Sequence, residues 1–208
     1  MPADHVAASG AAGRGSPQPP RTLTIEVARE IAPLQLVLDR GLSYRALTNA
    51  MSRPRLLAAL TTTPGIQVVP RDGGLLANLR VADNLLLPLR WLRNADTSGA
   101  LIRAQRWMME LGIDPARCAA LGDAMPEALT IFETRAVAWV RALLLNPEVL
   151  VLDRLSEGLV KRELLSASRV RSVFQRAYPF RALLCVVEDA EAMEAGESFI
   201  DLRRMAAA

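Results

Sequence analysis

The sequence predicts an α/β fold with a mainly parallel sheet. Two short apolar runs indicate this fold, Val149–Leu152 and Leu183–Val187. An unbroken apolar run is typical of a strand covered on both faces, as the strands of parallel sheets are. A helical segment before the first run is expected to end at Asn146, because Pro147 disfavours helical geometry in the residue before it. We expect the two runs to be neighbouring central strands.

Asp153 directly follows the first of these strands. In open α/β sheets, ligands bind beyond the carboxyl ends of the strands. A carboxylate there can hold Mg²⁺ directly or through water. An isolated aspartate at this place can equally well cap a turn, so the role of Asp153 depends on the motifs around it.

The chain before residue 66 gives weaker signals. Residues 1–21 are rich in Ala, Gly, Pro and Ser, which predicts a disordered tail before one domain over residues 22–208. Thr22–Val27 alternates polar and apolar residues, as an edge strand does, and Gln35–Leu38 is a second candidate strand. A short helix is expected over Arg55–Leu60.

The middle and the end of the chain read as helices with one last strand. Val81–Leu89 is a helix that Pro88 should end or kink, and Ser98 is a candidate N-cap for a helix reaching Leu111. Asp114 should cap a short helix that Pro115 begins. The further expected elements are a helix over Lys161–Ala177 and a strand within Ser198–Leu202. Expected core contacts on these helices are Leu101, Met108, Leu111, Leu165, Val170, Val173 and Phe174.

Composition excludes several classes of function. Hydrophobic residues make up 51% of the 208 residues, but no apolar run approaches the ~20 residues that span a bilayer. We therefore expect no direct membrane insertion. The basic residues are interspersed with acidic ones and aromatic residues are only 4%, so nucleic acid is not an expected partner. The single histidine, His5, lies in the tail, which argues against a catalytic triad or a histidine metal site.

Several segments resemble the ATP-binding subunits of ABC transporters. Residues 141–153, RALLLNPEVLVLD, resemble the approach to the Walker B strand of this family, and Ile66–Leu76 resembles its Q-loop strand. Leu129–Glu133 falls at the LSGGQ signature, at the family's offset to Asp153. The resemblance implies a P-loop NTPase-like sheet, a helical subdomain over 81–128 and a truncated N-terminal part. Residues 72–91 look most like the subunits that drive lipid trafficking across the bacterial envelope.

This sequence departs from the family at most of its chemical positions. Only Asp153 is clearly kept, and it would be a metal ligand only if Mg²⁺ is bound. The resemblance leaves four candidate nucleotide-site residues and no catalytic residue: Arg53 at the lysine of the phosphate loop, Arg71 at the Q-loop glutamine, Asp153, and Glu188 at the switch histidine. Further replacements are Ala50, Ser52, Ile131 and Phe132 for glycines, Pro54 for a hydroxyl residue and Arg154 for the glutamate that polarises water.

These replacements predict no significant ATP hydrolysis. A phosphate loop needs glycines so that several N–H groups can point at the phosphates, and proline has no N–H. The planar guanidinium of Arg53 does not simply replace a lysine, and Arg154 stays protonated and cannot act as a base. We expect no cofactor, or ATP and Mg²⁺ if any binding survives.

Three interpretations remain open. The chain is a degenerate ATP-binding subunit that assembles with a membrane permease subunit or an active homologous ATPase; it is a weak ATP-binding or ATPase subunit; or it is a non-catalytic scaffold. The first is favoured, because the helical subdomain that would contact a membrane subunit is retained. It implies a cytoplasmic protein or one peripheral at the inner membrane.

Overall fold

The computed structural model describes residues 22–27, 34–91, 97, 99–188 and 198–203, so the expected tail over 1–21 lies outside the described residues. The strands are β1 (Thr22–Val27), β2 (Leu34–Asp39), β3 (Ser43–Leu47), β4 (Ile66–Val69), β5 (Val149–Asp153), β6 (Ala182–Val187) and β7 (Ser198–Asp201). The helices are α1 (Ser52–Thr62), α2 (Val81–Trp91), α3 (Ala100–Glu110), α4 (Pro115–Leu121), the 3₁₀ helix η1 (Pro126–Ala128), α5 (Ile131–Leu144), α6 (Lys161–Ala167) and α7 (Arg169–Ala177).

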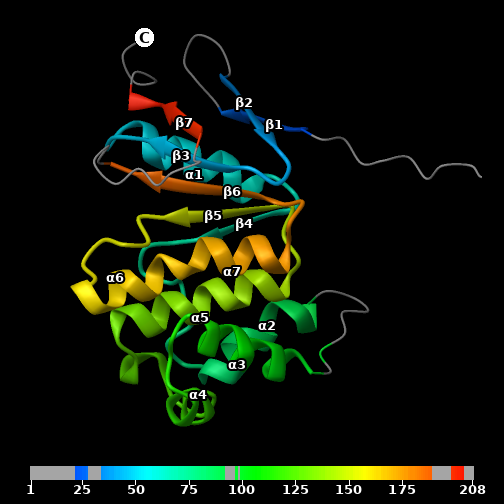
Figure 1. Cartoon of the computed structure of the whole chain (residues 1–208). Coiled ribbons are helices and arrows are strands. Elements are labelled where there is room, and N and C mark those ends of the chain that lie inside the picture. The colour runs from blue at the N-terminus through cyan, green and yellow to red at the C-terminus, as the bar shows by residue number, and fades with distance from the viewer. Residues whose placement is uncertain (1–21, 28–33, 92–96, 98, 189–197, 204–208) are drawn as a thin grey trace, which may run out of the picture.

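A five-stranded sheet in the order β4-β5-β6-β3-β7 forms the centre, and all its strand pairs are parallel. β5 pairs with β6, which confirms that the two apolar runs are neighbouring strands. The antiparallel pair β1-β2 and helix α1 lie on one side of the sheet, and α5, α7 and α2–α4 lie on the other (Figure 1). The predicted α/β class with a mainly parallel sheet is confirmed.

Two apolar clusters explain why the central strands are apolar at every position. Val149 and Val151 belong to the cluster with α1, β1 and β2, whereas Leu150 and Leu152 belong to the cluster with the helices on the other side. Successive side chains of a strand point to opposite faces. A strand between two covered faces therefore has no position that stays in water.

The described residues between Val81 and Ala128 form the helices α2, α3, α4 and η1. Of the two outcomes expected at Pro88, an end or a kink of the helix, the end is wrong, because α2 continues to Trp91. A proline removes only one N–H donor, and the packing of Val81, Leu85 and Leu89 in the core keeps the helix together. Asp114 caps α4 as predicted and accepts the N–H groups of Ala116 and Arg117 at 2.9 and 3.2 Å.

Helix α3 departs from its predicted start. The residue before it is Gly99, in a left-handed conformation with φ of 67°, and Ser98 lies outside the described residues. The left-handed region costs a residue with a side chain, which favours glycine there. Leu101 is 37% exposed, whereas Met108 and Leu111 are buried as expected.

The helix expected over Lys161–Ala177 is interrupted at Ser168 and forms α6 and α7. The Ser168 hydroxyl donates to the carbonyl oxygen of Leu165 at 2.9 Å, a local bond that competes with regular helix geometry. The interruption changes the face that α6 turns to the core, so Leu165 is 66% exposed and its assignment to the core is wrong. Val170, Val173 and Phe174 are buried as predicted.

Strand β3 was not predicted. Its sequence, SYRAL, contains Ser43 and Arg45, yet all five residues are buried. The run is short and not wholly apolar, and its brief alternation would place Ser43 and Arg45 in water, so the sequence did not indicate a buried strand. Within the described residues, no helix has the length and apolar character that crossing a membrane requires.

Candidate functional site

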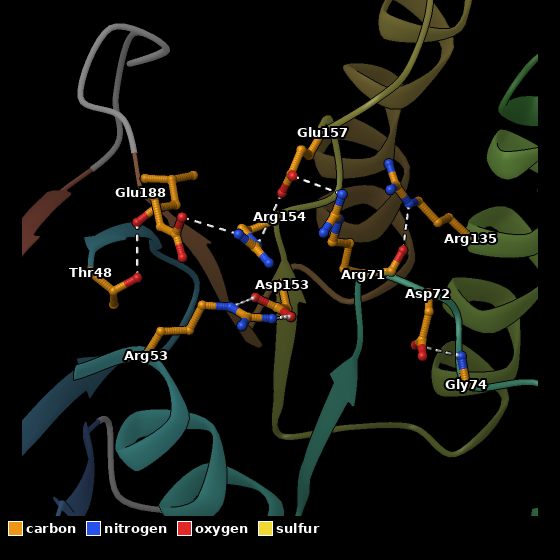
Figure 2. Close-up of polar contacts among 11 residues, drawn as sticks. Thr48, Arg53, Arg71, Asp72, Gly74, Arg135, Asp153, Arg154, Glu157 and Glu188 are labelled. Carbon is orange, nitrogen blue, oxygen red and sulfur yellow. Dashed lines mark hydrogen bonds and ion pairs between the residues drawn. The ribbon is translucent and has the colours of Figure 1, made fainter. Parts of the chain in front are cut away.

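The carboxyl ends of β3, β5 and β6 meet at one edge of the sheet, because the three strands are parallel neighbours. The loop after β3 brings Arg53 to this edge, β5 ends in Asp153, and Glu188 follows β6. The loop after β4 adds Arg71, and Figure 2 shows the four side chains around this edge. The topology therefore gathers all four predicted site residues, which lie far apart in the sequence.

Arg53 and Asp153 form a two-pronged ion pair. Nε of Arg53 donates to Oδ1 of Asp153 at 2.7 Å, and Nη2 donates to Oδ2 (Figure 2). The Asp153 side chain is 1% exposed and that of Arg53 is 21% exposed. The hydrogen bond to Asp153 is the main cause of the raised pKa of Arg53. Both oxygens of the one retained carboxylate are thus engaged by a cation from the same chain.

The loop between β3 and α1 satisfies its own backbone donors. The side-chain oxygen of Asn49 accepts the N–H groups of Met51 and Ser52 at 3.0 and 2.9 Å, and the Asn49 carbonyl accepts from Arg53 at 3.0 Å. In return, the Asn49 N–H donates to the Ser52 hydroxyl at 3.0 Å. Pro54 has no N–H. Residues 51–54 therefore direct no unsatisfied N–H group toward a phosphate.

A second set of ion pairs joins the remaining loops. Nη1 of Arg154 lies 3.0 Å from Oε2 of Glu188, and its Nε lies 3.1 Å from Oε2 of Glu157. Arg71 contacts the same Glu157, with 2.8 Å between Nη2 and Oε1 (Figure 2). The charges of Arg71, Arg154, Glu157 and Glu188 therefore compensate one another.

Arg135 of α5 donates hydrogen bonds to two of these loops, the one after β4 and the one after β5. Its Nε donates to the Arg71 carbonyl at 2.7 Å and its Nη1 to the Leu155 carbonyl at 2.6 Å. Arg135 is 4% exposed, and burial lowers its pKa, with the nearby charge of Arg71 as the next cause. The guanidinium fixes the position of the loop after β4 relative to the loop after β5.

A cavity of about 600 Å³ lies beside the Arg53–Asp153 pair. It is bounded by α1, by the loop after β4 and by the start of α5, and its lining combines guanidinium groups with apolar side chains: Arg53, Leu57, Pro70, Arg71, Asp72, Leu129, Ile131, Thr134, Arg135 and Asp153.

The start of α5, where the signature was located, is also capped by its own residues. The Thr130 hydroxyl accepts the N–H of Glu133 at 3.1 Å, and the Glu133 carboxylate accepts the N–H of Thr130 at 2.9 Å. Arg117 donates to both carboxylate oxygens at 2.7 and 3.0 Å and is the main cause of the lowered pKa of Glu133. The first two residues of α5 are apolar but differ in burial. Phe132 is buried, whereas Ile131 is 55% exposed.

The geometry also shows residues that were not predicted. Asn49, Arg135 and Glu157 hold the loops at this edge. Glu157 lies in a stretch that resembles the family's D-loop, but its contacts with Arg71 and Arg154 were not expected. Arg154 was noted as a replacement, whereas its pairing with Glu188 was not expected. The roles of Arg53, Arg71, Asp153 and Glu188 toward a ligand stay predictions.

Comparisons with known proteins identify the fold. No model of a protein family matches this sequence, and no curated protein matches it. Among solved structures, the chain is similar to an ATP-binding subunit of an ABC transporter, with a TM-score of 0.66 and 15% identity over 88% of this chain and 85% of that one. The chain has the fold of an ABC transporter ATP-binding subunit.

Two further structures with this fold give similar agreement. One is cbiO1 from Clostridium perfringens, part of the ABC transporter complex cbiONQ, with a TM-score of 0.60 and 14% identity over 80% of this chain and 78% of that one. The other is the ATP-binding cassette MJ0796 as a dimer in a post-hydrolysis state with ADP and Pi, with a TM-score of 0.65 and 16% identity over 88% of this chain and 91% of that one.

ATP and Mg²⁺ are the groups that the ABC ATP-binding-subunit fold implies, and the residues at this edge do not fit them. A magnesium ion at Asp153 would have to compete with a cation of the chain itself, because both carboxylate oxygens of Asp153 accept from Arg53. A triphosphate needs inward N–H groups, whereas those of Met51, Ser52 and Arg53 bond to Asn49.

Proposed function

We propose that this chain is a hydrolysis-deficient ATP-binding-subunit-like protein that acts as a structural or regulatory partner in an ABC transporter. The observation that carries the proposal is the ion pair between Arg53 and Asp153. It places a cation of the chain itself at the carboxylate where the family would hold magnesium. The fold supports the family part of the proposal, and the internally bonded loops support the loss of hydrolysis.

The partner in this proposal is a membrane permease subunit or an active homologous ATPase. The described helices α2, α3 and α4 supply the helical region that would meet a membrane subunit, and the protein would then act at the cytoplasmic face of the inner membrane. The finer assignment to lipid trafficking rests on the resemblance over residues 72–91. The division into a tail over 1–21, a domain over 22–208 and a helical subdomain over 81–128 is part of the same proposal.

Nucleotide binding is tested with purified protein and Mg-ATP, measured by calorimetry and by phosphate release. We expect neither binding nor turnover above that of the Asp153→Asn variant. ATP turnover at ordinary enzyme rates, lost in Asp153→Asn, would overturn the loss of hydrolysis. Binding without turnover would instead favour the weak ATP-binding alternative.

The partner is tested by co-purification from the native host. We expect a permease subunit to co-purify, and charge reversal at Arg90, whose side chain is 55% exposed at the end of α2, to weaken that complex. Arg93, the other candidate contact, lies outside the described residues. Consistent absence of any transporter subunit, with the chain folded and expressed, would favour the scaffold alternative.

A further inference from the structure

One segment of the chain has few carboxylates to balance its basic residues. Residues 161–181 carry six cationic side chains and one carboxylate, a net charge of +5, whereas the whole chain carries +3. The single carboxylate, that of Glu163, accepts the backbone N–H of Val160 at 3.1 Å. An excess of one sign of charge attracts partners of the opposite sign, and one of these cations, Arg176, lines a groove together with Arg103 and Arg106.

The C-terminal half of this segment borders a groove between α3 and α7. The groove has a volume of about 330 Å³ and is lined by Arg103, Arg106, Trp107, Glu110, Val173, Arg176 and Ala177. The start of α7 lies close to the end of α3, since a Cβ at Gly112 would lie 2.7 Å from Nη1 of Arg169. The groove shares no residue with the cavity beside Asp153.

Two guanidinium groups in the groove share one carboxylate. Nε of Arg106 lies 3.3 Å from Oε1 of Glu110, and Nη2 of Arg176 lies 2.9 Å from Oε2. The side chains of Arg106 and Arg176 are 79% and 62% exposed. A guanidinium has five N–H donors, so a single shared carboxylate leaves most of each group open to a second one. Glu110 holds the two cations at the groove and leaves it positive.

The shape of the groove argues against two classes of acidic partner. It is concave and is lined by the half-buried Trp107, whose ring centre lies 6.5 Å from that of Tyr178. A flat bilayer surface does not enter a groove of this size, and neither does a nucleic-acid duplex. An acidic peptide can place one carboxylate on each arginine and an apolar stem on the indole. We propose that the α3–α7 groove binds an acidic segment of a protein partner.

The test uses the full chain and a fluorescein-labelled oligoglutamate peptide, followed by fluorescence anisotropy. The double substitution Arg106→Glu with Arg176→Glu should weaken binding by at least about tenfold. The control, Arg80→Glu with Arg203→Glu, makes the same change in charge at two other exposed arginines and should leave binding within about twofold. Glu110→Gln removes the carboxylate of the groove and should tighten binding by about two- to fivefold.

Three results would contradict the proposal. Equal losses in the two double variants, both folded by circular dichroism, would show that only total charge matters. Groove-dependent binding of an oligothymidylate, or of phosphatidylcholine vesicles containing phosphatidylglycerol, without groove-dependent binding of the peptide would assign the surface to another class of partner. Unchanged affinity in Glu110→Gln would also count against a carboxylate site.

Discussion

Arg53 is the counterion of a carboxylate that water hardly reaches. Removing one member of a buried ion pair leaves an uncompensated charge, which is far more costly than the net value of the pair. The two members differ in this respect, because the Asp153 side chain is 1% exposed and that of Arg53 is 21% exposed. Stability should therefore depend more on Arg53 than on Asp153.

Substituting Arg53→Ala should lower the free energy of unfolding by about 3–5 kcal/mol, because Asp153 is left buried without a partner. Asp153→Asn should cost less, since Arg53 can turn to solvent. The double variant should recover part of the loss in a mutant cycle measured by urea unfolding. The control is Arg80→Ala, which breaks an exposed ion pair and should cost at most about 1 kcal/mol. Equal losses for Arg53→Ala and Arg80→Ala would contradict the assignment.

Glu133 should make the stability depend on pH. Its pKa is lowered, first by Arg117 and also by the N–H of Thr130, so its contribution is present in full above the ordinary glutamate pKa of 4.5. That contribution is lost as the pH falls through the lowered value. Glu133→Gln should cost about 1 kcal/mol at neutral pH and progressively less in acid, measured by urea unfolding across pH. Glu127→Gln, on the exposed turn before α5, serves as the control and should change neither stability nor its pH dependence.

At the scale of the elements, one buried side-chain amide, that of Asn84, connects α2 to the segment before it. Asn84 is fully buried; its oxygen accepts the N–H of Leu76 at 2.8 Å, and its NH₂ donates to the carbonyls of Leu76 and Leu79, both at 3.0 Å. Asn84 thus fixes the irregular segment before α2 against the first turn of that helix. Arg141 secures the preceding Gly-Gly turn from α5 by donating to the carbonyls of Gly73 and Gly74 at 3.2 and 3.0 Å.

Replacing Asn84 by the similarly sized leucine should destabilise the protein by about 2–4 kcal/mol, because the Leu76 N–H and carbonyl lose their partner inside the fold. Amide hydrogen exchange should rise most in residues 75–80. Asp83→Asn, one residue away on the exposed side of the helix, is the matched control and should have little effect. Uniform exchange throughout the chain would show instead that Asn84 supports global stability alone.

At the scale of the whole molecule, the sheet separates two apolar clusters, and the larger one includes the helical segment from α2 to α4. Much of this arrangement could be predicted from the sequence. Val149–Leu152 and Leu183–Val187 indicated the central strands because both faces of the sheet are covered. Strand β3 gave no signal, since Ser43 and Arg45 are polar and yet buried.

The candidate site was predictable only in part. Asp153 was found from its place at the end of a strand, and the resemblance pointed to Arg53, Arg71 and Glu188. The contact between Arg53 and Asp153 joins residues separated by 100 positions, and no local spacing indicates it. It exists because β3 and β5 lie on either side of β6, which is a property of the strand order.

The reactivity of Cys118 can show whether the larger apolar cluster opens locally or only when the whole chain unfolds. Its side chain is 2% exposed, and burial raises the pKa of its thiol, so the reactive thiolate is scarce in the folded state. In a Cys185→Ser background, thiol labelling of native protein should be slower than that of urea-unfolded protein by at least about a hundredfold. Labelling near the unfolded rate, with the sheet intact by circular dichroism, would show that α3 and α4 open independently.

The hydrogen bonds within the loop after β3 bear on how this chain would respond to the cell's supply of ATP. A subunit whose loops close only around bound nucleotide changes with the supply of ATP. Under the function proposed above, the contacts of Asn49 and Arg53 would form with or without ATP, so the edge of the sheet would keep one shape at any ATP concentration. In a transporter that paired this chain with an active subunit, only the active subunit would respond to ATP. Each transport cycle would then be powered by one subunit alone.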